Sequence, residues 1–145
     1  MPVSTRQPET PHDAAGVHAA IDERLDQPLF KALADATRLR VLSCLVKCGR
    51  PCSVSEVAAC CDVEFSVVNK HLKILAAADV LSAEKRGRTV WYAARCGDLS
   101  RRLAMLIDAI AEWCPNIDPS APAAADRPIG RPCCSGPAAR SGGGA

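Results

Sequence analysis

The stretch SVSEVAACCDVEFSVVNKHLKILAAA, residues 53–78, decides the fold. Its opening Ser53-Val-Ser-Glu56 fits a capping box, in which Ser53 caps a helix and Glu56 reaches back to the helix start. This helix is predicted to run to about Cys60, and a second helix is predicted over residues 65–78 after a short interruption. Two short helices joined by a tight turn are typical of a helix-turn-helix.

The second predicted helix carries polar and apolar residues on opposite sides. At about 100° per residue, its polar side chains fall within an arc of about 100°. They are Ser66, Asn69, Lys70 and Lys73, opposite Val68, Leu72 and Leu75. Such a helix can enter a major groove and offer hydrogen bonds to base edges. His71 lies nearer the apolar side, where we expect a hydrogen-bonded core histidine rather than a metal ligand or a base reader.

After this helix the sequence pattern changes from helical spacing to one typical of strands. Residues 82–86 and 88–94 are predicted to form two short strands around Gly87. Lys85, Arg86 and Arg88 surround the turn, so the hairpin resembles a basic wing that reaches a phosphate or a minor groove. The alternative is a small helical bundle with an incidental hairpin.

Helices are also predicted on both sides of this region. Upstream, apolar spacing predicts short helical segments over residues 17–26 and 29–34 and a longer helix over 36–47. Downstream, large apolar residues recur at intervals of 4, 3, 4 and 3; they are Leu99, Leu103, Leu106, Ile110 and Trp113. Such a seam usually pairs with another helix. We therefore expect a homodimer with N- and C-terminal dimerisation helices, in which Leu103, Leu106 and Ile110 lie in the interface together with the segment 17–26.

The composition favours one domain with tails. Of 145 residues, 48% are hydrophobic and 23% are charged, which is typical of a folded soluble protein. We expect a flexible N-terminus over 1–16, a DNA-binding and dimerisation domain over 17–114, and a disordered Pro/Ala/Gly tail over 115–145. The fold class is mostly α (α+β), a winged helix-turn-helix. Residues 65–102 carry eight basic and three acidic side chains, a net charge of +5, which favours a localised polyanion-binding face.

Several classes of protein are disfavoured. No apolar run approaches the roughly 20 residues of a membrane span, and the N-terminus lacks the apolar core of a secretory signal. We therefore expect no membrane association and a cytoplasmic location, where thiols stay reduced. Nine Cys in that compartment favour metal, metalloid or redox chemistry over a disulfide framework. No Gly-rich phosphate loop or nucleophile–base arrangement indicates an enzyme.

Three segments resemble the ArsR/SmtB family of metalloregulatory repressors. They are LFKALADATRLRVL over 29–42, NKHLKIL over 69–75 and KRGRTVWY over 85–92. The resemblance covers about residues 25–112. It implies a dimeric winged helix that binds double-stranded operator DNA, with Ser66, Asn69 and Lys70 facing the groove, and that leaves the DNA on binding a metal or metalloid. The family often has Ser at position 69 and Gln at position 65, so the operator sequence is left open.

Two sensor sites known from the family are missing. The Cys-Val-Cys-Asp motif of arsenic sensors is replaced here by Ser53-Val-Ser-Glu56, and the last helix, residues 100–113, has no His for a zinc site. A different sensor site must exist, or the protein does not sense a metal.

Cys60 and Cys61 are the leading candidate ligands. Adjacent thiolates suit soft ions, and they can supply two corners of a three-thiolate site, which the resemblance associates with trivalent arsenic or antimony. The third ligand is predicted to come from the tail pair Cys133 and Cys134, with Cys52, Cys96 and Cys114 as alternatives. Another possibility is a second cluster of Cys44, Cys48 and Cys52, which recur every four residues, although core packing is favoured for Cys44.

These observations favour a transcriptional repressor released by As(III) or Sb(III). One alternative keeps the repressor and changes its signal to cadmium, lead, zinc or thiol oxidation. An alternative of another class is a cysteine-rich metal carrier or buffer, which needs neither a polar recognition face nor a basic wing.

Overall fold

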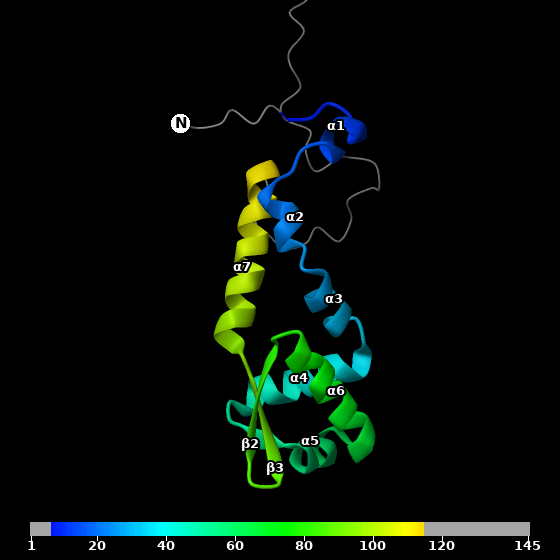
Figure 1. The fold of residues 1–145 in the computed structure, drawn as a ribbon, viewed down its shortest axis with the longest axis vertical. Helices are drawn as coiled ribbons and strands as arrows, with labels where there is room; N and C mark the ends of the chain where they lie inside the picture. The colour runs from blue at the N-terminus through cyan, green and yellow to red at the C-terminus, as the bar shows by residue number, and fades with distance from the viewer. Residues whose placement is uncertain (1–6, 115–145) are drawn as a thin grey trace, which may run out of the picture. The chain divides into compact units, whose positions relative to one another are not determined.

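A computed structural model describes residues 7–114 of the chain (Figure 1). The tail predicted over 115–145, with Cys133 and Cys134, lies outside the described residues, as do residues 1–6. The described part divides into two compact units, one made of residues 7–18 and 107–114 and the other of residues 19–106. Within the described residues, no helix is both long and apolar enough to cross a membrane.

The first unit contains α1 (Pro11–Ala15) and the end of α7 (Cys96–Trp113). Thr10 caps α1 by accepting a hydrogen bond from the backbone N–H of Asp13, and Pro11 occupies the first turn, where proline needs no N–H partner. The side chain of Gln7 donates to the carbonyl of Trp113 over 3.2 Å. The described part of the segment expected to be flexible, residues 7–16, therefore contains a short capped helix.

Three helices precede the helix-turn-helix in the second unit. They are α2 (Ala20–Arg24), α3 (Gln27–Leu33) and α4 (Ala36–Cys48). The prediction of one helix over 17–26 was too long, because the Asp22 carboxylate accepts the N–H of Ala19 over 2.8 Å and starts the helix there. Asp26 and Asp35 are the N-cap residues of α3 and α4, and their carboxylates accept the backbone N–H groups of Leu29 and Arg38 over 3.0 and 2.9 Å.

The predicted helix-turn-helix is present as α5 (Val54–Cys61) and α6 (Phe65–Ala77). The capping box forms as expected, because the N–H of Ser53 donates to Glu56 over 3.0 Å and the N–H of Glu56 donates to Ser53 over 3.3 Å. Asp62 ends α5 in the left-handed conformation with φ 51°, which turns the chain into α6.

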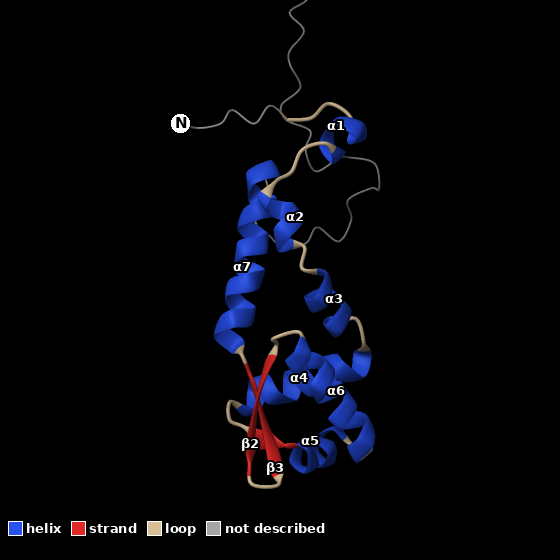
Figure 2. Ribbon diagram, in the orientation of Figure 1, coloured by secondary structure: helices blue, strands red, loops and turns tan. Residues whose placement is uncertain are grey.

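The hairpin consists of β2 (Leu81–Arg86) and β3 (Thr89–Ala94), shown in red in Figure 2. Arg86 pairs with Thr89 across a two-residue turn, in which Gly87 has a positive φ of 64°. The sequence did not predict a third strand, β1 (Cys52–Ser53), which pairs antiparallel with Trp91 and Tyr92 of β3. The sheet order is β1-β3-β2.

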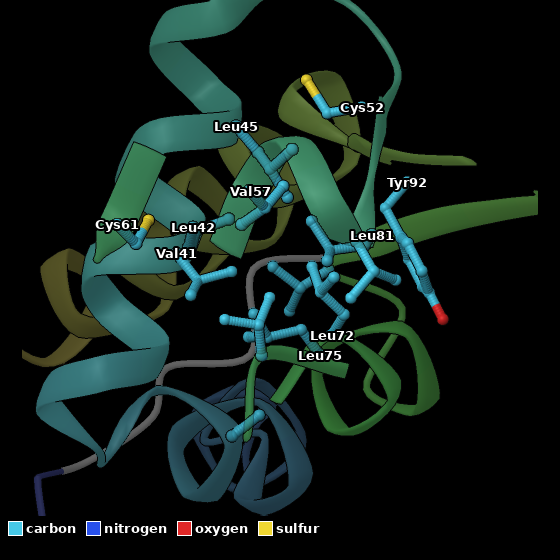
Figure 3. Close-up of a cluster of buried hydrophobic side chains, with 14 of the residues drawn as sticks. Val41, Leu42, Leu45, Cys52, Val57, Cys61, Leu72, Leu75, Leu81 and Tyr92 are labelled. Carbon is cyan, nitrogen blue, oxygen red and sulfur yellow. The ribbon is translucent and has the colours of Figure 1, made fainter. Parts of the chain in front are cut away.

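The core of this unit lies among α4, α5, α6 and the sheet (Figure 3). Its fully buried side chains are Val41, Leu45, Val57, Val68, Leu72, Leu75 and Val80. The three apolar residues predicted to face inward from α6, namely Val68, Leu72 and Leu75, are each 0% exposed. The burial of this face determines which face of α6 is left for a ligand.

Truncation of Leu72 tests this core. The Leu72→Ala variant should lose about 2–5 kcal/mol of unfolding free energy, because it leaves a cavity at a site that is 0% exposed. Leu39→Ala, at an α4 position that is 48% exposed, is the matched control and should change stability by much less. Urea unfolding followed by circular dichroism measures both, and equal losses would contradict this placement of the core.

Candidate functional site

The outward face of α6 presents the side chains predicted to contact DNA. Ser66, Lys70 and Lys73 are exposed, and Asn69 is half-buried. Ser66 donates its hydroxyl to the Glu64 carboxylate over 2.9 Å. A base or phosphate that accepts a hydrogen bond from this hydroxyl must therefore displace the Glu64 carboxylate.

His71 holds α6 to the preceding helices. It is half-buried, and its Nδ1 atom lies 3.5 Å from a guanidinium nitrogen of Arg38 on α4. Arg38 also donates to the carbonyl of Ala32 over 2.6 Å. His71 therefore has a polar partner inside the fold, which agrees with the prediction of a structural rather than a ligand-binding histidine.

The wing carries its basic side chains at the hairpin tip. Lys85, Arg86 and Arg88 are exposed. Arg86 makes a two-pronged contact with Glu84, at 3.1 and 3.0 Å. The hydrogen bond from Arg86 lowers the pKa of the Glu84 carboxyl. Since both side chains are more than half exposed, solvent screens this pair, and a phosphate oxygen can replace the carboxylate as the partner of Arg86.

One pocket collects five of the cysteines. It has a volume of about 520 Å³, and α4, α5 and the segment between them line it. The cysteines are Cys44, Cys48, Cys52, Cys60 and Cys61. The sequence predicted Cys60 and Cys61 as ligands and left the role of the other three open. The structure thus places the two predicted ligands and the other three cysteines in the same pocket.

The thiols in this pocket form two close pairs. The Cys44 thiol donates to the Cys60 sulfur over 3.2 Å, and the sulfurs of Cys48 and Cys52 lie 3.4 Å apart. Cys61, beside Cys60 in the chain, is buried against the core, and Cys52 is buried at another edge of the same core (Figure 3). Cys44 is half-buried and packs against the hydrophobic core, which agrees with the core packing that its sequence neighbours favoured, and its thiol also contacts Cys60.

The neighbouring thiols and burial act on the acidity of two of these cysteines. The hydrogen bond to Cys60, followed by burial and the charges of Cys61 and Cys60, raises the pKa of Cys44 to about 12. Burial and the hydrogen bond to Cys48 raise the pKa of Cys52 to about 11. Both groups are therefore neutral thiols at pH 7, and they react slowly with oxidants and alkylating agents, which attack thiolates.

Basic side chains surround the thiols. Arg40, Lys47 and Arg50 line the pocket, against one carboxylate, that of Glu56. Arg50 pairs with Glu56 at 3.4 Å, and the Arg40 guanidinium donates to the carbonyl of Cys61 over 2.7 Å. The pocket therefore has an excess of positive charge, and Arg40 ties α4 to the last turn of α5.

The predicted dimer seam is partly exposed along α7. Leu103 and Ile110 are 38% and 37% exposed, and Ile107, which the sequence analysis did not select, is 51% exposed. These three residues fall on one side of the helix, within about 60° of each other. Leu106 is half-buried and lines a small pocket with α2 and α3 residues of the same unit, so part of the predicted seam packs within the protomer.

The chain is similar to known regulators of transcription. A family model described as a helix-turn-helix domain matches residues 33–82, which run from the end of α3 to the start of β2. An uncharacterised HTH-type transcriptional regulator, YceK of Bacillus subtilis strain 168, is 30% identical over 74 residues, which are 51% of this chain and 74% of that protein.

Two solved structures agree in sequence and fold. An ArsR-like transcriptional regulator from Rhodococcus sp. RHA1 is 32% identical with a TM-score of 0.53, over 59% of this chain and 79% of that chain. The crystal structure of another ArsR family transcriptional regulator is 30% identical with a TM-score of 0.51, over 63% of this chain and 92% of that chain.

Proposed function

Because this chain belongs to the ArsR family of winged helix-turn-helix transcriptional regulators, we propose that it is a repressor with a metalloid signal. It binds double-stranded operator DNA as a homodimer and leaves that DNA when cysteine thiolates bind As(III) or Sb(III). The outward face of α6 reads the major groove, and the wing holds neighbouring phosphates.

The single observation that carries this proposal is the gathering of five cysteines in one pocket between α4 and α5, the first helix of the helix-turn-helix. Thiolate ligands select soft ions, and in the cytoplasm such thiols stay reduced and available. DNA recognition requires none of these cysteines, so their gathering beside the reading head favours a chemical signal.

The position of the pocket suggests how the signal reaches DNA. Cys60 and Cys61 end α5, and only Asp62, Val63 and Glu64 separate them from α6. An ion that pulls on these sulfurs displaces the start of the reading helix. In a dimer the two reading helices must match half-sites spaced by the turn of the DNA, so a small displacement costs affinity.

Thiol oxidation is the second candidate signal, favoured by the 3.2 Å separation of the Cys44 and Cys60 sulfurs. The pKa of Cys44, raised to about 12 by the hydrogen bond to Cys60, argues against it, because oxidants attack thiolates. Cadmium, lead and zinc remain alternative inducers for a repressor of the same fold. A metal carrier without DNA binding is disfavoured by the exposed polar face of α6 and the basic wing.

A gel shift with DNA from upstream of the chain's own gene tests the proposal. Titration with arsenite should lower operator affinity by about a thousandfold, which requires about 4 kcal/mol of differential binding between free and DNA-bound protein. Cadmium, zinc and hydrogen peroxide are run in parallel. Retention of the DNA at saturating arsenite would reject the metalloid signal, and release by one of the others would identify the signal instead.

The salt dependence of DNA binding tests the wing. If Lys70, Lys73, Arg86 and Arg88 each meet a phosphate, a dimer makes about eight contacts and log K falls with log salt at a slope near −7. Reversing Arg86 and Arg88 to Glu removes four of these contacts and should flatten the slope by about 3.6.

Matched variants sharpen this measurement. Glu84→Gln removes the competing partner of Arg86 and should strengthen binding at low salt, whereas Glu112→Gln, at an exposed position near the end of α7, should not. Fluorescence anisotropy at several salt concentrations measures all three variants. An unchanged slope in the double reversal would remove the wing from the interface.

The exposed seam of α7 supports the homodimer. An Ile107→Asp substitution places a charge at the most exposed member of this seam, at 51%, and leaves the core of the protomer intact. Burying an unpaired charge in the interface costs several kcal/mol. Sedimentation should therefore show monomers with weak operator binding.

Glu112→Lys, on the opposite side of α7, is the control and should remain dimeric. Circular dichroism confirms that both variants are folded. A dimeric Ile107→Asp protein would show that α7 does not form the interface.

A further inference from the structure

The closest group of thiols in the pocket joins two helices. We infer that Cys44 of α4 with Cys60 and Cys61 of α5 forms a three-thiolate site for a neutral, trivalent metalloid hydroxide such as arsenous acid. Its role as the inducer site rests on the proposed function, but binding of the metalloid does not. The third ligand is thus Cys44, in place of the tail cysteines that the sequence favoured.

The separation of two sulfurs fits a shared central atom. With sulfur bonds of about 2.3 Å, two ligands on one atom lie roughly 3.4–3.8 Å apart. The sulfurs of Cys44 and Cys60 are 3.2 Å apart, so a shift of a few tenths of an ångström opens the space for the atom between them.

Cys61 supplies the third corner. It follows Cys60 in the last turn of α5 and lines the same pocket as Cys44 and Cys60. Its nearness to Cys44 also contributes to the raised pKa of the Cys44 thiol. Among the described residues, no three His, Cys, Asp or Glu side chains already stand in a metal-binding arrangement. Closing the site therefore requires a side-chain rotation, and cysteine has three staggered positions available about its Cα–Cβ bond.

Cys48 and Cys52 form a weaker candidate. Their sulfurs lie 3.4 Å apart, but the other polar contact of the Cys52 thiol is the backbone carbonyl of Arg50, at 3.4 Å. This pair lies at the far end of α4 from the Arg40 contact with α5. It offers two sulfurs and no third, so we assign the metalloid to the Cys44 group.

The charge of the pocket selects the chemical class of the ligand. Its lining carries the cations Arg40, Lys47 and Arg50 but only the carboxylate of Glu56, which Arg50 already pairs. A divalent cation entering this pocket is repelled until several thiols have lost their protons. Arsenous acid, As(OH)₃, is uncharged at neutral pH and meets no such repulsion.

The binding step balances without any further reactant. Three As–O bonds break and three As–S bonds form, and each thiol proton leaves with one hydroxide as water. The three products are thus water molecules, arsenic stays trivalent, and the bound group As(SR)₃ is neutral. No oxidant, reductant or net release of protons is needed.

Binding would join helices that are now held by weaker contacts. The polar contacts between α4 and the end of α5 include the hydrogen bond from Arg40 to the carbonyl of Cys61, 2.7 Å long, and that from the Cys44 thiol to Cys60, 3.2 Å long. A central atom shared by Cys44, Cys60 and Cys61 fixes the same two segments covalently. The last turn of α5 then loses the freedom to follow α6 when α6 enters a groove.

Direct binding of arsenite to the reduced, full-length chain tests the site. The sulfur-to-arsenic absorption in the near ultraviolet should saturate at one arsenic per chain. At saturation, the number of thiols that react with a thiol reagent should fall by three. Cys60→Ser, at an exposed position, should weaken binding at least tenfold, which corresponds to about 1.4 kcal/mol. Cys44→Ser should do the same.

Three matched variants should bind arsenite like the unmodified chain. They are Cys48→Ser, which alters the other thiol pair, Cys96→Ser, which alters an exposed cysteine of α7, and a truncation after Cys114, which removes the tail. Loss of binding in Cys48→Ser or in the truncated chain, or full binding in Cys60→Ser, would overturn the assignment. Tighter binding of Cd²⁺ than of arsenite at the same thiols would overturn the neutral class of ligand.

Protection of the unmodified chain gives a second measurement, because Cys61 is buried and its substitution can unfold the protein. Arsenite should slow iodoacetamide alkylation of Cys44, Cys60 and Cys61 after brief exposure to urea, as mapped by peptide mass spectrometry. Alkylation of Cys48 should stay unchanged. Protection confined to Cys48 and Cys52 would overturn the assignment.

The failure of the site and the failure of the proposed function are distinguishable. If arsenite binds these three thiols but operator DNA stays bound, the site stands and the repressor model fails. If arsenite releases DNA equally from the Cys44→Ser and Cys60→Ser variants, the repressor model stands and this site is rejected.

Discussion

The burial of one face of α6 is the constraint on which the rest of the structure depends. Val68, Leu72 and Leu75 are 0% exposed, and they meet buried residues of α4 and α5. Since a helix has 3.6 residues per turn, fixing these three positions also fixes the direction of every other side chain on α6. Ser66, Lys70 and Lys73 of the reading face are therefore exposed, and Asn69 is half-buried at its edge.

The parts of the fold that depend on local signals were predictable from the sequence. The bounds of α4, α5 and α6 agree with the predictions to within about a residue, because caps at Asp35 and Ser53 and apolar spacing mark them. In contrast, β1 has only two residues and no pattern of its own. It exists as a strand because Tyr92 and Trp91 pair with it, and a pairing across about 40 residues leaves no local signal.

The candidate site shows the same division. Cys60 and Cys61 were predicted as ligands because residues that are adjacent in the sequence always lie close together in space. The partner of Cys60 was not predictable, because Cys44 lies 16 residues away on another helix and its spacing fits core packing equally well. The contact between the Cys44 and Cys60 sulfurs is determined by the packing of α4 on α5. The raised pKa of Cys44 results from this contact, so it could not be predicted from the sequence either.

The short strand β1 has a mechanical consequence. Its two residues lead directly into α5 and are hydrogen-bonded to β3 at Trp91 and Tyr92, so the base of the wing is attached to the start of the first helix of the helix-turn-helix. From Tyr92 to Arg88 at the tip, four residues of extended chain span about 13 Å. With this length as a lever arm, a rotation of only about 5° at the base displaces the tip by about 1 Å. A tilt of α5 that rotates this base would therefore displace the arginine side chains at the tip by more than it displaces the base itself.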